Sequence, residues 1–290
     1  MGLGKKLSAG EFVILAEMEP PKGTDVSQMV DNLLRVKGSV DAFVIPEMSN
    51  AVMRMSALGA AMIIQNKGVE TIMQVCCRDR NRLALQADLL AAGAIGITHI
   101  MAVQGEAPGF GDHHQARAVY DIDLIELLDV LKTLRMGKDM AGIELMGAPQ
   151  FAVWGTANAG LEGQALDREI EEMRRKVDAG ASFFILPPVF DTNSISQFMA
   201  RTAPLGVHII PTVLLLKSLG MARYVQRHLG HVHIPESVID RLKKAPEKAR
   251  ECVIIAAETI TALKAAGFGG VMIATIGWEH RLPEIIEAIN

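Results

Sequence analysis

The chain of 290 residues has little of what marks an extracellular, membrane-spanning or nucleic-acid-binding protein. It has three cysteines, Cys76, Cys77 and Cys252, and no CxxC pair, so neither a disulfide framework nor a zinc knuckle is supported. No apolar run is long enough to span a bilayer, and Met1–Glu11 lacks the apolar core of a signal peptide. The formal net charge of −4 gives no indication of a nucleic-acid or anionic-membrane partner. We therefore expect a cytoplasmic protein.

Aromatic residues are also scarce, at 4% of the chain, whereas hydrophobic residues make up half of it. A chain of this length and apolar content can bury a sizeable core and suits one large domain. The 16 methionines indicate flexible side chains that fill gaps in this core. No linker divides the sequence, so we predict a single domain over residues 1–290.

Short apolar runs rich in Val and Ile alternate with helix-like stretches from one end of the chain to the other. The runs predict strands buried on both faces at Val13–Met18, Val40–Pro46, Thr71–Cys76, His99–Val103, Gln150–Trp154, Phe183–Pro187, His208–Leu214 and Gly270–Thr275. Helical spacing is clearest in Thr24–Lys37, Asp121–Arg135 and Asp167–Ala179. Eight strands, each followed by a helix, predict an α/β fold of the single (β/α)₈ barrel type.

The first predicted strand ends in an acidic residue, Glu17, and a proline turn at Pro20-Pro21 follows. The prolines have a fixed φ and no N–H donor, which makes the turn rigid. Such a turn can hold a carboxylate at the barrel mouth, where catalytic residues of this fold lie. Glu106, after the fourth strand, puts a second acid at the same mouth. Two acids there can divide into a proton donor and an electrostatic partner; the alternative is that both are solvated loop acids.

Other polar motifs favour structural interpretations. The Gly-rich stretch Pro108–Asp112 does not match GxGxxG and predicts a flexible loop in place of a phosphate cradle. His113 and His114 have no partner at ligand spacing, so we predict no metal site. Cys76 and Cys77 have no nearby histidine and are expected to pack at the third strand end.

The charged run Arg78–Arg82 has two interpretations that the sequence leaves open. In the first, it begins a helix with Asp79 as the N-cap. In the second, its arginines contact an anion at a helix N-terminus.

The order and spacing of several motifs resemble the methylenetetrahydrofolate reductase family, from about Glu11 to the last strand. The motifs are Glu17-x-x-Pro20-Pro21, Cys77-Arg78-Asp79, Val103-Gln104-Gly105-Glu106, Tyr120-x-x-Asp123-Leu124, Arg175-Lys176-Val177-Asp178-Ala179-Gly180-Ala181, Phe190-Asp191 and Val232-x-Ile234-Pro235. Ala51-Val52-Met53-Arg54 and Arg78–Arg82 are most similar to the short catalytic subunit of anaerobic acetogenic bacteria.

The resemblance implies a barrel with FAD across the strand ends and an oxidoreductase of one-carbon metabolism. Reduced flavin would pass a hydride to 5,10-methylenetetrahydrofolate and give 5-methyltetrahydrofolate. Glu17 aligns with the general acid of the family, and Glu106 with an Asp beside flavin and pterin. The flavin contacts of the family fall on Gln74, Gly105, Tyr120, Asn158, Glu169 and Lys176.

Three positions depart from the family pattern and affect the expected partners. Pro46 replaces a Thr, Pro187 lies where a Gln contacts the pterin, and Leu219 replaces an aromatic residue. Because the flavin positions are better preserved than the folate positions, the exact pterin and direct use of NADH stay open. The expected partners are a folate-type C1 substrate, an electron-transfer subunit and further copies in an oligomer.

Two alternatives keep the barrel without the hydride chemistry. One is a pterin- or C1-carrier-binding protein or methyltransferase component, and the other is a docking subunit for an iron–sulfur electron-transfer partner.

Overall fold

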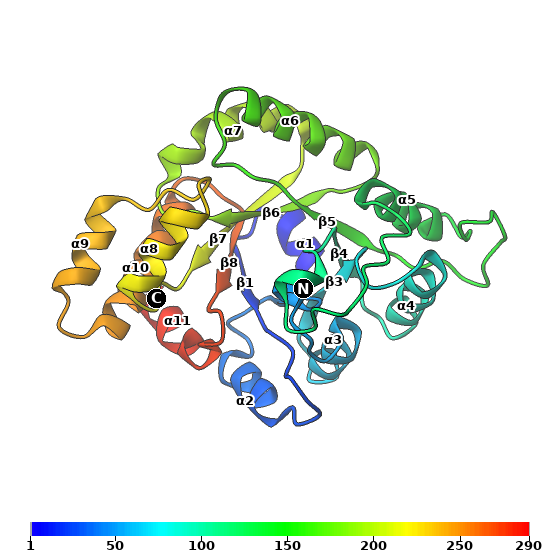
Figure 1. Cartoon of the computed structure of the whole chain (residues 1–290), viewed down its shortest axis with the longest axis horizontal. Coiled ribbons are helices and arrows are strands. Elements are labelled where there is room, and N and C mark those ends of the chain that lie inside the picture. Colours follow the sequence, from blue (N-terminus) through cyan, green and yellow to red (C-terminus); the bar gives the residue numbers. More distant parts are fainter. Residues whose placement is uncertain (1, 290) are drawn as a thin grey trace.

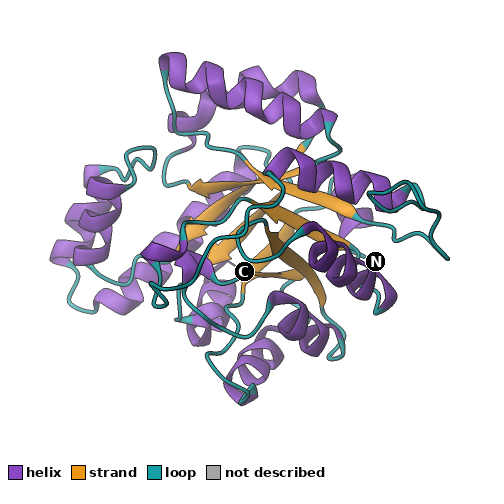
Figure 2. Ribbon diagram, turned by 45° about the vertical axis from the view of Figure 1, so that its right-hand side comes forward, coloured by secondary structure: helices purple, strands orange, loops and turns teal. Residues whose placement is uncertain are grey.

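A computed structural model describes residues 2–289 and shows a closed barrel of eight parallel strands (Figure 1). The strands follow one another around the barrel in chain order, and the first closes the ring by pairing with the last. The helices lie outside the strands (Figure 2). The prediction of a (β/α)₈ barrel is confirmed.

The strands lie where the Val- and Ile-rich runs predict them. They are β1 (Val13–Glu17), β2 (Ala42–Ile45), β3 (Glu70–Cys76), β4 (His99–Val103), β5 (Ala152–Thr156), β6 (Phe183–Pro188), β7 (His208–Leu214) and β8 (Gly270–Ala274). The predicted bounds of β4 and β7 are correct at both ends. Those of β2 and β5 differ by one or two residues at both ends, and the others differ by one residue at one end. Burial on both faces explains the near-continuous apolar sequence of these strands.

The described chain also contains helices that separate the strands and surround the barrel. They are α1 (Leu3–Ser8), α2 (Ser27–Val36), α3 (Ala57–Gln65), α4 (Arg82–Ala94), α5 (Leu124–Arg135), α6 (Gly163–Asp178), α7 (Ser196–Thr202), α8 (Leu219–His228), α9 (Glu236–Lys244), α10 (Lys248–Ala265) and α11 (Leu282–Ile289). The predicted helix Asp121–Arg135 begins three residues later than expected, because Asp123 is its N-cap and forms a capping box with Glu126.

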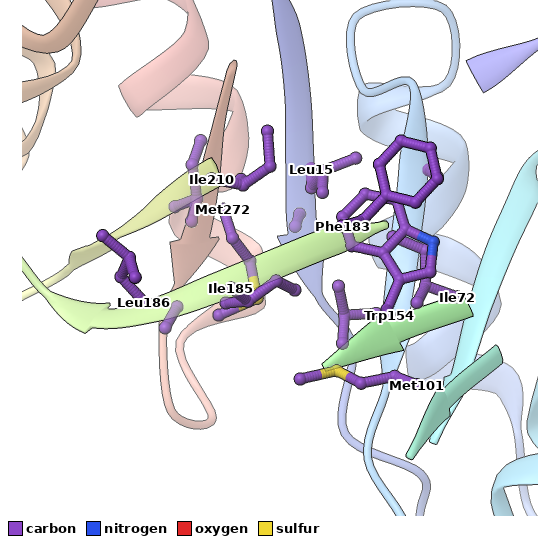
Figure 3. Packing of buried hydrophobic residues seen from close by; sticks show 14 of the residues in the cluster. Leu15, Ile72, Met101, Trp154, Phe183, Ile185, Leu186, Ile210 and Met272 are labelled. Atoms are coloured by element: carbon purple, nitrogen blue, oxygen red, sulfur yellow. The ribbon is translucent and has the colours of Figure 1, made fainter. Parts of the chain in front are cut away.

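Large side chains from several strands fill the interior of the barrel (Figure 3). Trp154 stacks on Phe183 with ring centroids 4.6 Å apart, and its Nε1 donates to Nδ1 of the buried His99 over 3.0 Å. At the amino ends of the strands, Leu3 and Leu7 of α1 are buried against the core. The interior is therefore a packed core, and the opposite, carboxyl end is the place for a site.

Backbone strain lies at this carboxyl end. The described non-glycine residues with positive φ are Met48, Asn50, Ala51, Tyr120 and Ile276, and all follow the carboxyl end of a strand. Such strain costs of order 1–3 kcal/mol per residue and often accompanies functional sites. Among residues 2–289, no helix is long and apolar enough to cross a membrane.

Candidate active site at the barrel mouth

Glu17 is the last residue of β1 and lies partly buried beside Val44 of β2. Burial raises the pKa of its carboxyl to about 7, and the charges of Glu19 and Glu279 add to this effect. An acid with this pKa exists in both protonation states near neutral pH. It is therefore suited to donate a proton at the barrel mouth.

The sequence did not reveal that two other carboxylates, Glu19 and Glu279, act on Glu17. Glu19 forms an ion pair with Arg54 at 2.9 Å, and burial raises its pKa although Arg54 acts in the opposite direction. Glu279, after β8, accepts hydrogen bonds from the Gly277 amide at 2.8 Å and the Thr275 hydroxyl at 3.3 Å. Since β8 pairs with β1, closure of the barrel brings the segment after β8 to the end of β1.

Glu106 lies after β4, away from this acidic group. Its side chain is 56% exposed, and its carboxylate lies 3.8 Å from Nη1 of Arg78. The expectation that Glu106 supplies the negative charge acting on Glu17 was wrong, because Glu19 and Glu279 supply it. Glu106 is still at the mouth, but on the rim formed by the loops after β3 and β4.

Arg78 joins three loops of this rim. Its guanidinium is 2% exposed and forms two hydrogen bonds of 2.7 Å with the Asp79 carboxylate. It also donates to the main-chain carbonyls of Met48, after β2, and Glu106, after β4, both at 3.3 Å. This buried charge is thus paired and hydrogen-bonded, as its burial requires.

The structure corrects the first interpretation of the run Arg78–Arg82, and the second, an anion contact, stays a prediction. Asn81, not Asp79, is the N-cap of α4, and its side chain accepts from the Ala84 amide at 3.1 Å. The arginines pair with carboxylates of the chain itself: Arg78 with Asp79, Arg80 with Glu47 and Asp88, and Arg82 with Asp121. The run therefore holds loops together and leaves its arginines already paired.

Gly105 and Tyr120 form one compact part of the mouth. Gly105 has φ of +81°, and a Cβ there would lie 2.2 Å from Sγ of Cys76, so only glycine fits without displacement. The Tyr120 hydroxyl donates to the Gly105 carbonyl at 3.0 Å. Cys76 and Cys77 are buried, and burial raises their thiol pKa values to about 11 and about 12. This fits the predicted packing role and opposes a nucleophilic one.

Asn158, Glu169 and Lys176 meet beside the end of β5. Glu169 accepts from the Asn158 main-chain amide at 3.0 Å, while the side-chain oxygen of Asn158 is buried without a hydrogen-bond partner among the described residues. Lys176 is 6% exposed, and its ammonium donates to the Thr156 carbonyl at 2.9 Å. An unused acceptor and a buried cation suit a ligand that brings a donor and an anionic group.

Gln74 in β3 completes the expected set of cofactor residues. Its side-chain oxygen accepts from the Glu47 main-chain amide at 3.2 Å, so it also supports the loop after β2. The mouth thus has an acidic side at β1 and β8, with Glu17, and an amide- and cation-bearing side at β3 to β5.

The positions that depart from the family pattern are apolar. Pro46 is buried directly after β2. Pro187 and Pro188 end β6, where the pairing with β7 shifts register after Ile185. Leu219 is the first residue of α8, after the N-cap Ser218, and packs against the core. No polar side chain is present at any of the three positions.

The sequence profile of the methylenetetrahydrofolate reductase family matches residues 3–290. The 5,10-methylenetetrahydrofolate reductase of Salmonella typhimurium is 28% identical over 164 residues, which cover 56% of this chain and 49% of the relative. Methylenetetrahydrofolate reductase 2 of Schizosaccharomyces pombe is 22% identical over 252 residues, covering 83% of this chain and 38% of the relative. This chain thus spans less than half the length of either relative.

Solved structures of low sequence identity show the same fold. A 2,3-dimethylmalate lyase is 13% identical, with a TM-score of 0.56 over 99% of this chain and 83% of that one. An EDTA monooxygenase from Chelativorans sp. BNC1 is 11% identical, with a TM-score of 0.57 over 96% and 92% of the two chains.

Proposed function

Because the chain belongs to the methylenetetrahydrofolate reductase family, we propose that it reduces 5,10-methylenetetrahydrofolate to 5-methyltetrahydrofolate as an FAD-dependent oxidoreductase. The observation that supports this reaction best is Glu17, a partly buried acid with a pKa of about 7 at the barrel mouth. Opening the five-membered ring of the substrate requires a proton at the departing nitrogen. An acid with a pKa near the working pH supplies it best.

The chain offers residues that fit FAD at the same barrel mouth as this acid. Lys176 would meet the pyrophosphate, and the unpaired oxygen of Asn158 would accept a hydrogen bond from the cofactor. Gln74, Gly105, Tyr120 and Glu169 shape the same side of the mouth. When bound and reduced, FAD supplies the hydride that the methylene carbon of the substrate accepts.

Glu17 then has a defined task. In its protonated form it donates to the ring nitrogen as the bond between this nitrogen and the methylene carbon breaks. Glu19 and Glu279 favour the protonated form before the reaction, since they disfavour a further negative charge. Glu106 remains the proposed electrostatic partner of the flavin and pterin, not of Glu17, on the opposite rim, where Arg78 holds the main chain that carries it.

The test is direct. The purified chain, incubated with FAD and freed of excess cofactor, should be yellow and should convert methylenetetrahydrofolate to the methyl product when reduced chemically under anaerobic conditions. A colourless protein that still binds the folate would instead identify the non-redox carrier-binding alternative. A yellow protein that cannot form the product would refute the proposed reaction.

We further propose that a partner subunit delivers the electrons. Leu219 provides no aromatic ring to stack on nicotinamide, so NADH alone is expected to reduce the flavin slowly. Anaerobic stopped-flow mixing of the FAD-loaded chain with NADH measures this rate. Rapid bleaching of the flavin without any partner would contradict the proposal.

A further inference from the structure

The segment between β4 and α5 reaches across the barrel mouth to the loops after β1 and β2. The Asp112 carboxylate forms an ion pair with Lys22, after β1, and accepts from the Met53 amide, after β2, at 3.0 Å. In Figure 1 the 3₁₀ turn Pro108–Phe110 of this segment lies over the barrel, inside the ring of outer helices. The segment therefore joins the rim after β4 to the opposite side of the mouth.

Both ends of this segment are fixed at Arg78. Nη1 of Arg78 donates to the Glu106 carbonyl at 3.3 Å, and the Val119 amide donates to the Arg78 carbonyl at 2.7 Å. The Tyr120 hydroxyl adds its hydrogen bond to the Gly105 carbonyl. Because the Arg78 guanidinium is buried and paired, these attachments form a firm base.

Between these ends, residues 107–118 have few contacts that hold them in place. None of these residues is buried, and Phe110 is 80% exposed. An exposed ion pair contributes little to stability, and the side chains of Lys22 and Asp112 are 48% and 29% exposed. The segment thus has firm ends and a weakly held centre, which is typical of a lid.

The surface that receives the centre of the segment fits it closely. A Cβ on Gly111 would lie 1.7 Å from the carbonyl oxygen of Ala51, so only glycine fits there without displacement. Ala51 and its neighbours Met48 and Asn50 have positive φ, which non-glycine residues rarely adopt. Such strained main chain persists where the surrounding contacts hold it. The closed position of Gly111 thus depends on this strained turn after β2.

The loops after β1 and β2 form one support for the segment. Arg54 pairs with Glu19 at 2.9 Å, and the Met55 amide donates to the Pro21 carbonyl at 3.0 Å. A contact with either loop therefore closes the mouth from β4 to β1.

We propose that residues 107–118 form a lid over the space between Glu17 and Glu106, hinged at Arg78 and latched by Asp112. The lid opens at its centre when the folate-type substrate enters and closes before the proton is transferred. The identity of this substrate rests on the proposed function. Closure excludes water from the acid, as closing loops do in other enzymes.

Amide hydrogen exchange of the ligand-free chain tests the latch. Lys22→Met removes the ion pair but leaves the Asp112 carboxylate to accept from the Met53 amide. The exchange rate of this amide should rise roughly 2- to 5-fold, the change expected for loss of an exposed ion pair. Arg117→Ala is the matched control, because it removes an exposed lid charge that has no ion-pair partner among residues 2–289. An unchanged rate in Lys22→Met would overturn the latch.

A covalent latch tests the opening. In Lys22→Cys/Asp112→Cys, a short bis-maleimide should join the two side chains, while the native cysteines are buried and do not compete. Before cross-linking, the FAD-loaded double variant should bind 5-methyltetrahydrofolate at least as fast as the parent, measured by stopped-flow tryptophan fluorescence. After cross-linking, this binding should be lost. Each single variant, treated with the same reagent, should still bind.

The two measurements separate the lid from the proposed reaction. Undiminished binding to the cross-linked protein would overturn the lid as the substrate entrance and leave the proposed reaction in place. A parent chain that binds no folate would refute the proposed substrate and, with it, the role of the lid as its gate. The exchange rate of the Met53 amide would still report the latch, because that measurement needs no ligand.

Discussion

Replacement of Glu17 by Gln should lower turnover and raise stability in the same protein. Glutamine keeps the shape of the side chain but has no proton to donate, so turnover should fall by roughly 10²–10⁴-fold. FAD content should stay near that of the parent, because the proposed cofactor residues lie around β3 to β5. Loss of activity with retained flavin separates a chemical role from a folding defect.

The effect on stability follows from the pKa of Glu17. Its value rises from 4.5 to about 7 on folding, so the folded protein binds this proton more tightly than the unfolded chain. The resulting stabilisation is fully present below about pH 4.5 and is lost as the pH rises through 7. Above that range, ionised Glu17 lowers the free energy of unfolding by up to about 3 kcal/mol relative to a neutral side chain.

Urea unfolding of the FAD-free parent and Glu17→Gln proteins measures this difference. The variant should be more stable than the parent by up to about 3 kcal/mol near pH 9, and the gap should close toward about pH 4. A gap that does not change with pH would show that Glu17 titrates normally. Turnover close to the parent value would refute its role as the general acid.

Three further predictions concern single contacts at the mouth. Lys176→Ala should weaken FAD binding by roughly 1–3 kcal/mol through loss of a charged hydrogen bond, and fluorescence titration with FAD would show an unchanged affinity if the placement is wrong. Gly105→Ala should lower the free energy of unfolding by more than about 1 kcal/mol, because its Cβ would overlap Cys76, and urea denaturation checks this. Glu279→Gln should lower the pKa of Glu17, so the activity should decline at a lower pH than in the parent; an unmoved pH–rate profile would count against the coupling.

The sequence predicts the barrel well because local patterns determine it. Runs such as His99–Val103 and His208–Leu214 are largely apolar without alternation. This pattern is typical of a strand that is covered on both faces, as both strands are in the barrel. The end of β1 also follows from local sequence, since Glu17 comes directly before a proline turn. Features of this kind need no knowledge of distant parts of the chain.

The site was harder to predict because its contacts join distant segments. Glu279 acts on Glu17 only because β8 closes the ring onto β1, and no local pattern shows this. Arg78 belongs to a run of alternating charges that resembles a solvated helix start, yet it is among the most buried large side chains. The N-cap of α4 was misplaced for a similar reason: Asp79 is a good cap by type, but its carboxylate is already engaged by Arg78.

The position of Arg78 has a consequence for how this barrel can diversify. Loops on a barrel are usually regarded as independent modules that evolution or design can exchange one at a time. Here the segments after β2, β3 and β4 share one guanidinium, and Arg80 ties α4 to Glu47 as well. Exchange of any one of these segments would remove some of the carbonyl or carboxylate acceptors that the buried Arg78 guanidinium needs. The three loops are therefore structurally coupled and would have to change together if the substrate preference on this rim changed.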